Sequence, residues 1–132
     1  MKRTLFLMIT ILMVICFASF SVAEAATRAN PVFSEASIYL YDDFKAHFTA
    51  TTMVLCPQIS VSSCSLQVYR GGRWKDHSSL TVPTDSSATN SAVFDALKDY
   101  NTSVPQGGKY RIKATFSGAG ESVTRYSNAR TK

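Results

Sequence analysis

The sequence predicts an all-β protein: a small antiparallel β-sandwich of about seven short strands that follows an N-terminal signal peptide. Apolar and polar residues alternate in several short segments, as in strands with one buried face. Turn residues separate these segments at intervals of about 8 to 12 residues, and no regular alternation of helices with strands is visible. The 132-residue chain has the length of one domain once a signal peptide is removed.

The N-terminal segment has the pattern of a secretory signal peptide. Two basic residues precede an apolar run over residues 5–20, and small residues follow at Ala23 and Ala25. Alanines at the −3 and −1 positions of a cut after Ala25 suit a signal peptidase, and a cut after Ala23 is the second choice. The competing interpretation is a retained membrane anchor, but the run is shorter than the ~20 residues that a spanning helix needs. We therefore expect a secreted domain of residues 26–132 without a transmembrane segment.

The expected mature chain is basic and keeps two of the three cysteines. It contains 12 Lys and Arg against 8 Asp and Glu, a net charge of +4. A basic balance favours anionic partners without identifying one. Cys56 and Cys64 remain after processing, and export to an oxidising compartment lets them pair. The sequence thus predicts a Cys56–Cys64 disulfide, with free thiols or a metal pair as alternatives, although no further ligand cluster completes a metal site.

The first strands follow from alternation and turn residues. Residues 36–41 (ASIYLY) form a strand that ends in an Asp-Asp turn, and residues 45–53 form the next one. Two arrangements are then open. Either the chain folds back about Ser60, so that Cys56 opposes Cys64, or it crosses from one packed sheet to another.

The strongest local pattern is a hairpin at Gly71 and Gly72. Both glycines can adopt the positive φ angles that a two-residue hairpin turn requires. Residues 65–70 and 74–80 are the expected strands of this hairpin, with Arg70 opposite Arg73 and Tyr69 opposite Trp74. A polar loop over residues 83–90 follows it.

The C-terminal third contains one ambiguous segment and two strands. In residues 91–100, one set of apolar residues recurs with helical spacing from Val93, whereas another alternates from Ala92 as in a strand. Residues 109–117 (KYRIKATFS) alternate clearly, and residues 121–130 form a last edge strand. Together these strands indicate a sandwich of the immunoglobulin or fibronectin kind.

Two motifs, VYRGGRW at residues 68–74 and KYRIKATF at residues 109–116, carry a resemblance to a known family. They are similar to the Ile-Tyr-x-x-x-Gly-x-x-Trp and Lys-Tyr-Tyr-x-Val-x-Phe patterns of small secreted β-sandwich proteins of Firmicutes. The matching residues are Tyr69, Trp74, Tyr110 and Phe116. The resemblance extends over nearly the whole mature chain and implies fold and secretion, with these residues in the core or the hairpin. It implies no activity, because the family is uncharacterised.

The sequence contains no catalytic motif. The patterns of serine hydrolases, zinc proteases, P-loop proteins, dinucleotide-binding proteins and CxxC redox proteins are all missing. His47 and His77 are the only histidines, and each lies in an expected strand, which favours a solvent-facing or hydrogen-bonded role over a catalytic or metal-binding one. We therefore expect no enzyme activity, no catalytic residue, no metal and no cofactor.

One surface is a candidate for binding. The patch comprises Tyr69, Arg70, Arg73, Trp74, Lys75, Lys109, Arg111 and Lys113. On one interpretation its hairpin tip is a solvated turn whose charges protect a sheet edge. On the other, arginine forks hold phosphate, sulfate or carboxylate groups beside an exposed aromatic ring, provided that the strand of Arg111 lies next to the hairpin.

Three classes of function follow from these features. The first is a secreted, non-catalytic binding module at the cell envelope or in the medium, with an anionic envelope polymer or a protein as partner and no specific nucleic acid. The alternative is a cationic antimicrobial or bacteriocin-like protein, although no long basic amphipathic helix is visible. A small extracellular enzyme is the third, and it would need reactive groups from distant strands.

We predict that the mature protein begins near Ala26 and is found outside the cell. Mass spectrometry of protein from the medium would show this N-terminus, and replacing Ala25 by a large residue should slow processing or move it to Ala23. Protein with an intact N-terminus that stays with the cells would contradict the prediction.

Overall fold

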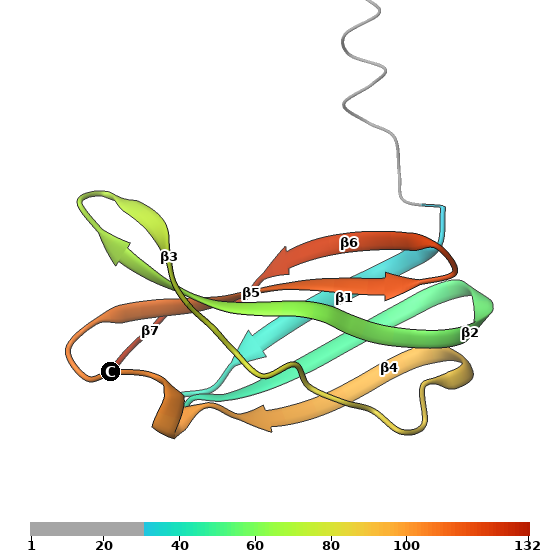
Figure 1. The fold of residues 1–132 in the computed structure, drawn as a ribbon, viewed down its shortest axis with the longest axis horizontal. Coiled ribbons are helices and arrows are strands. Elements are labelled where there is room, and N and C mark those ends of the chain that lie inside the picture. Colours follow the sequence, from blue (N-terminus) through green and yellow to red (C-terminus); the bar gives the residue numbers. More distant parts are fainter. Residues whose placement is uncertain (1–30) are drawn as a thin grey trace, which may run out of the picture.

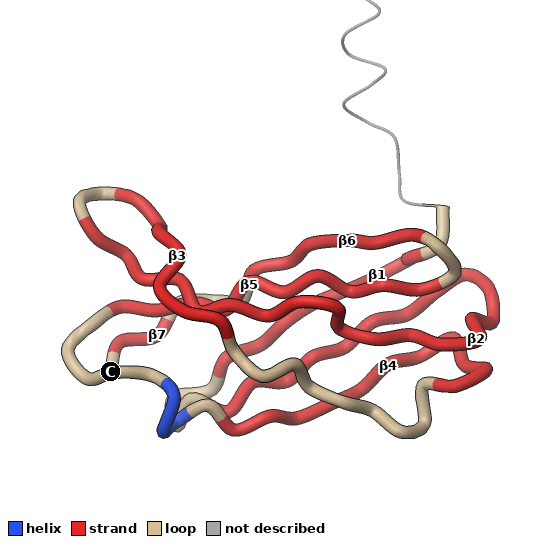
Figure 2. Tube along the Cα trace, viewed as in Figure 1, coloured by secondary structure: helices blue, strands red, loops and turns tan. Residues whose placement is uncertain are grey.

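The computed structural model of the chain describes residues 31–132, and the expected signal peptide lies outside them. Seven antiparallel strands form one sheet, and the described residues contain no α-helix (Figures 1 and 2). The strands are β1 (Phe33–Leu40), β2 (Lys45–Arg70), β3 (Arg73–Ser79), β4 (Thr89–Asp99), β5 (Lys109–Gly118), β6 (Glu121–Tyr126) and β7 (Arg130–Thr131), and one 3₁₀ turn, η1, spans Asn101–Ser103. Within residues 31–132, no helix combines the length and the apolar character needed to cross a membrane.

The architecture depends on β2, which contains 26 residues and belongs to both halves of the sheet. Its N-terminal part pairs with β1 on one side and β4 on the other, and we call these strands the first half. Its C-terminal part pairs with β3 and β5, and β5 pairs in turn with β6 and β7 to complete the second half. The sheet therefore curls over its own core (Figure 1). The all-β antiparallel prediction is confirmed, whereas a two-sheet, immunoglobulin-like sandwich is not, because β2 makes the two halves continuous.

The curl is produced by irregularities within β2. The register against β4 shifts between Thr51 and Cys56, and the register against β5 shifts between Val61 and Ser63. Such bulges bend a strand and increase its twist, so they turn β2 from one half into the other. The chain does not fold back about Ser60, and the passage from one layer to the next takes place inside a single strand.

Three aromatic rings join the two halves across the core. Phe48 of β2 and Phe94 of β4 contribute from the first half, and Phe116 of β5 from the second. The ring centroid of Phe116 lies 6.4 Å from that of Phe48 and 6.0 Å from that of Phe94. All three side chains are fully buried, so the rings form the centre of the apolar core.

The ambiguous segment is a strand. β4 buries Phe94 and Ala96, while Val93 and Leu97 are more than half exposed, which is the alternation of a strand and not the stripe of a helix. Pairing with β2 satisfies the backbone groups along one edge of β4, and the contact of Phe94 with Phe116 fixes which face is buried. The exposed Val93 and Leu97 explain why an apparent helical stripe was present in the sequence.

Side chains complete the sheet where strands do not pair. Asn128 accepts a hydrogen bond from the Leu40 backbone N–H at 2.7 Å and donates one to the Leu40 carbonyl at 2.9 Å. Its side-chain amide thus makes the two hydrogen bonds that a neighbouring strand would otherwise make with Leu40. At the free edge of β4, the Asp85 carboxylate accepts the Asp95 backbone N–H at 2.9 Å. Hydrogen bonds from Ser87 and from this N–H lower the pKa of Asp85. The expected strand 121–130 is interrupted because Asn128 turns toward β1.

The predicted disulfide is wrong. Cys56 and Cys64 are free and buried, and both lie in the continuous strand β2. Eight residue steps along an extended strand span up to about 26 Å, whereas bonded cysteines need Cα atoms within about 7 Å. The Cys64 Sγ atom instead lies 3.6 Å from the hydroxyl of Tyr100. Burial raises the pKa of Cys64 to about 11. The prediction failed because it depended on a turn that β2 does not make.

We expect both thiols to be present and protected in the native protein. Burial excludes a reagent, and the raised pKa keeps Cys64 protonated at pH 8, where a thiolate is needed for reaction. Ellman's reagent should therefore react only slowly with the native mature protein. After denaturation in about 6 M guanidinium chloride, it should react with both cysteines. Absence of thiol in denatured, unreduced protein would contradict this expectation.

Candidate functional site

The outer face of the second half holds most of the charged and aromatic residues that the sequence singled out. Alternation along β5 buries Tyr110 and Ile112 and turns Lys109, Arg111 and Lys113 outward. The neighbouring strands add aromatic side chains on the same face. We call the following group the cation–aromatic face: Gln67, Tyr69, Trp74, Lys109, Arg111, Lys113 and Tyr126.

Arg111 lies at the centre of this face, between two aromatic rings. Its Cζ atom is 4.5 Å from the ring centroid of Trp74 on β3 and 4.3 Å from that of Tyr126 on β6. The guanidinium is planar and weakly hydrated, and both properties favour contact with aromatic rings. The rings thus hold the charged group at a defined place on the outer surface of the sheet.

A second cation–ring contact lies beside the first. The Lys109 Nζ atom is 5.5 Å from the ring centroid of Tyr69, and the Tyr69 and Trp74 centroids are 5.2 Å apart. Tyr69 pairs with Trp74 across β2 and β3, as expected from the Gly-Gly turn. Since the rings touch each other and the cations, Lys109 and Arg111 belong to one continuous cluster.

Gln67 links this cluster to an acidic residue without neutralising it. The Gln67 carbonyl oxygen accepts a hydrogen bond from Arg111 Nε at 2.8 Å, and the Gln67 amide nitrogen donates to Asp76 at 2.8 Å. The amide stands between the two charged groups, and no ion pair joins them. The ion pairs of residues 31–132 are Asp43–Lys45, His47–Asp95 and Asp42–Arg130, so none of the three β5 cations takes part in one.

The structure divides the expected patch into two faces. The hairpin has the expected register, with Arg70 opposite Arg73. Side chains that pair directly point to the same side of a sheet, and neighbouring pairs point to opposite sides. Arg70 and Arg73, and Lys75 opposite the inward-facing Val68, therefore lie on the side away from Tyr69 and Trp74. This hairpin projects from one end of the molecule (Figure 1).

Sequence reasoning missed two members of the cluster, Gln67 and Tyr126. Gln67 looked like an ordinary outward residue of a strand, yet it is only 7% exposed because its neighbours on the face cover it. Tyr126 lies on a strand with little alternation, and its contact with Arg111 depends on the pairing of β6 with β5. The polar character of position 67 on a strand of the hairpin was the one available indication.

The two histidines lie elsewhere and have ordinary contacts. His47 Nε2 is 3.1 Å from both carboxylate oxygens of Asp95 on the outer face of the first half. His77 packs edge-on against Tyr110, with ring centroids 6.0 Å apart. No group of three or more His, Cys, Asp or Glu in the described part of the chain has an arrangement suitable for a metal ion.

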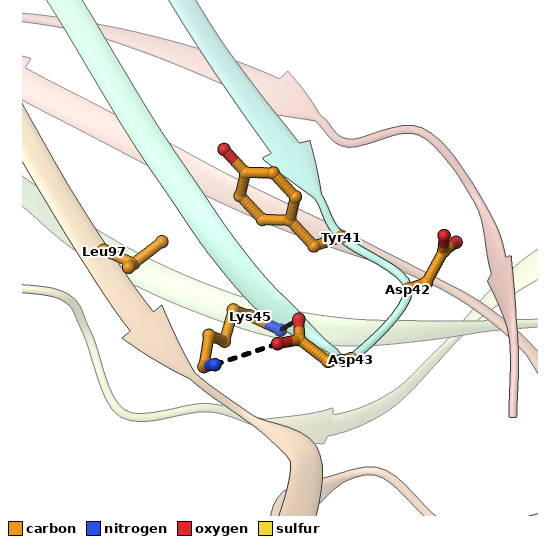
Figure 3. A pocket seen from close by; sticks show the side chains of 5 residues that line it. All are labelled: Tyr41, Asp42, Asp43, Lys45 and Leu97. Carbon is orange, nitrogen blue, oxygen red and sulfur yellow. Dashed lines mark hydrogen bonds and ion pairs between the residues drawn. The ribbon is translucent and has the colours of Figure 1, made fainter.

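An open surface hollow lies beside the turn between β1 and β2 (Figure 3). Its walls are Tyr41, Asp42, Asp43, Lys45 and Leu97. The Lys45 ammonium lies 2.9 Å from Asp43, and its hydrogen bond lowers the pKa of that carboxyl group. The Asp42 carboxylate pairs with Arg130 at 3.1 Å. Its acidic groups already have partners, which makes this hollow a weaker candidate than the cation–aromatic face.

Comparisons with protein-family models, with curated proteins and with solved structures found no match to this chain.

We predict that Gln67 positions Arg111 and stabilises the fold. Replacing Gln67 by Met keeps the volume but removes both amide hydrogen bonds, so the free energy of unfolding should fall by about 1 to 3 kcal/mol. Urea denaturation measures this change. Ser65→Ala, on the same strand and face, is the control and should change stability by less than about 0.5 kcal/mol. Equal stability of Gln67→Met and the unaltered protein would show that the two hydrogen bonds of the Gln67 amide do not stabilise the fold.

Proposed function

We propose that this chain is a secreted, non-catalytic binding module that holds an anionic polymer of a cell envelope on its cation–aromatic face. The observation that supports this most directly is the line of Lys109, Arg111 and Lys113, three cations of one strand without an ion-pair partner among residues 31–132.

Three like charges on alternate positions of one strand repel each other. Alternate residues are about 6.6 Å apart along a strand, which is within the screening length of about 8 Å at physiological ionic strength. A polymer with repeated anionic groups would relieve this repulsion, and it would also be attracted over a distance. The charges are thus better explained by a polyanionic partner than by the stability of the isolated domain.

The aromatic members of the face support a binding role as well. Tyr69 and Tyr126 are 43% and 48% exposed, although their rings contact the basic side chains. Lys109 and Arg111 therefore lose little conformational entropy when a partner binds, because contact with the rings already restricts their side chains. The proposal follows the signal-peptide pattern and the resemblance to secreted proteins in placing this face outside the cell.

We predict that charge reversal on this face abolishes binding. Lys109→Glu with Lys113→Glu leaves Arg111 and its rings in place, and should remove cosedimentation with isolated bacterial envelopes. Raising NaCl from about 0.05 to 0.5 M should weaken binding by the unaltered protein, because surface charges are screened.

The matched control is Arg73→Glu with Lys75→Glu, which makes the same change in net charge on the opposite side of the hairpin. It should keep most of the binding. Equal loss in both variants would indicate attraction by net charge alone, and unchanged binding in the first variant would refute the proposal. Dye leakage from anionic vesicles would favour the antimicrobial alternative instead.

A further inference from the structure

We infer that Arg111 is the anchor of this face, and that it binds an oxyanion group of a linear acidic polysaccharide. This inference rests on the proposed function and names the ligand class and the residue that recognises it.

Arg111 has free hydrogen-bond donors in a fixed position. Its Nε donates to Gln67, and the two Nη groups donate no hydrogen bond to another described residue. A guanidinium has five N–H groups in a fork that matches two oxygens of a phosphate, sulfate or carboxylate. Arg111 therefore keeps its terminal donors for a ligand, while Nε serves to hold the group.

Three contacts keep this fork from moving. The ring of Trp74 approaches from β3, that of Tyr126 from β6, and the Gln67 amide from β2. An arginine on a bare surface must be ordered when it binds an anion, which reduces affinity. Here the contacts within the protein have already ordered it.

A polysaccharide suits the surroundings of Arg111 better than a single-stranded nucleic acid does. Nucleic acids of this kind bind by stacking bases on aromatic faces. On this face, Trp74 and Tyr126 contact Arg111, and Tyr69 contacts Lys109, so the rings serve mainly to position cations.

The sheet beyond Lys113 offers hydroxyl groups to a sugar chain. Ser65 pairs with Lys113, and the next outward residues on β5 and β6 are Thr115 and Thr124, whose hydroxyls are 2.9 Å apart. Hydroxyls can donate to and accept from the hydroxyls of a sugar. A chain lying along β5 would thus meet cations at one end and hydroxyls at the other.

The intrinsic fluorescence of Trp74 provides the test, because it is the only tryptophan of the chain and contacts Arg111. We would titrate the protein with dextran sulfate, dextran phosphate, carboxymethyl dextran and uncharged dextran of equal length. At least one charged derivative should give a saturable change in emission, and uncharged dextran none. The tightest of the three identifies the preferred oxyanion.

Arg111→Lys keeps the charge but loses the fork, and we expect it to weaken binding by about tenfold. Lys75→Arg, a conservative change on the opposite side of the hairpin, is the control and should leave affinity within about twofold. Circular dichroism and urea denaturation would establish whether both variants fold.

The outcomes separate this inference from the proposed function. If the polyanions bind but Arg111→Lys binds as tightly as the unaltered protein, Arg111 is not the anchor, although the face still binds. If no polyanion changes the emission and the unaltered protein does not cosediment with isolated bacterial envelopes, both proposals fail. Tighter binding of a thymidine oligonucleotide than of every dextran derivative would overturn the assignment to a polysaccharide.

Discussion

The continuity of β2 is the constraint on which the rest of the structure depends. This strand of 26 residues pairs with four others, so the strands of both halves of the sheet are positioned by the same backbone. Its bulges set the angle between the halves, and that angle allows Phe116 to meet Phe48 and Phe94 in the core. A turn at Ser60 would have separated the two halves. The same continuity keeps the two cysteines apart.

The cation–aromatic face is a consequence of this arrangement. Gln67 occupies the position in β2 between the hairpin strand β3 and the central strand β5, so it can contact both Asp76 and Arg111. Trp74 and Tyr126 come from the two strands that flank this pair, and their rings meet over the same guanidinium. The position of the charge is therefore determined by pairing across four strands and not by any local motif.

Local patterns predicted the parts of the fold that depend on neighbouring residues. The Gly71-Gly72 turn set the register of Tyr69 with Trp74, and residues 109–117 alternate so strictly that β5 differs from the expected strand by one residue. Longer-range features were not accessible in this way. Pro57 and the serines near residue 60 resemble a turn, whereas tertiary pairing keeps them within β2.

The candidate site was predicted only in outline, because its membership also depends on pairing between strands that are distant in the sequence. All eight expected residues lie on or beside the hairpin, but only five of them belong to the face that contains Trp74. Alternation within the hairpin already separates Arg70, Arg73 and Lys75 from the rings, and the sequence interpretation overlooked this because both sides of a tip reach solvent. Tyr126 could not be found without knowing that β6 pairs with β5.

The Asn128 amide has a consequence for the order in which the chain can fold. It satisfies the backbone of Leu40 from a distance of 88 residues along the sequence. Bringing together such distant segments is slow, because the entropy of closing a long loop is lost before the contact is gained. The C-terminal end of β1 therefore stays incomplete until the chain has been synthesised as far as Asn128. A nascent chain that stops short of Asn128 exposes this part of an edge strand, and the Asn128 amide covers it once that residue has been added.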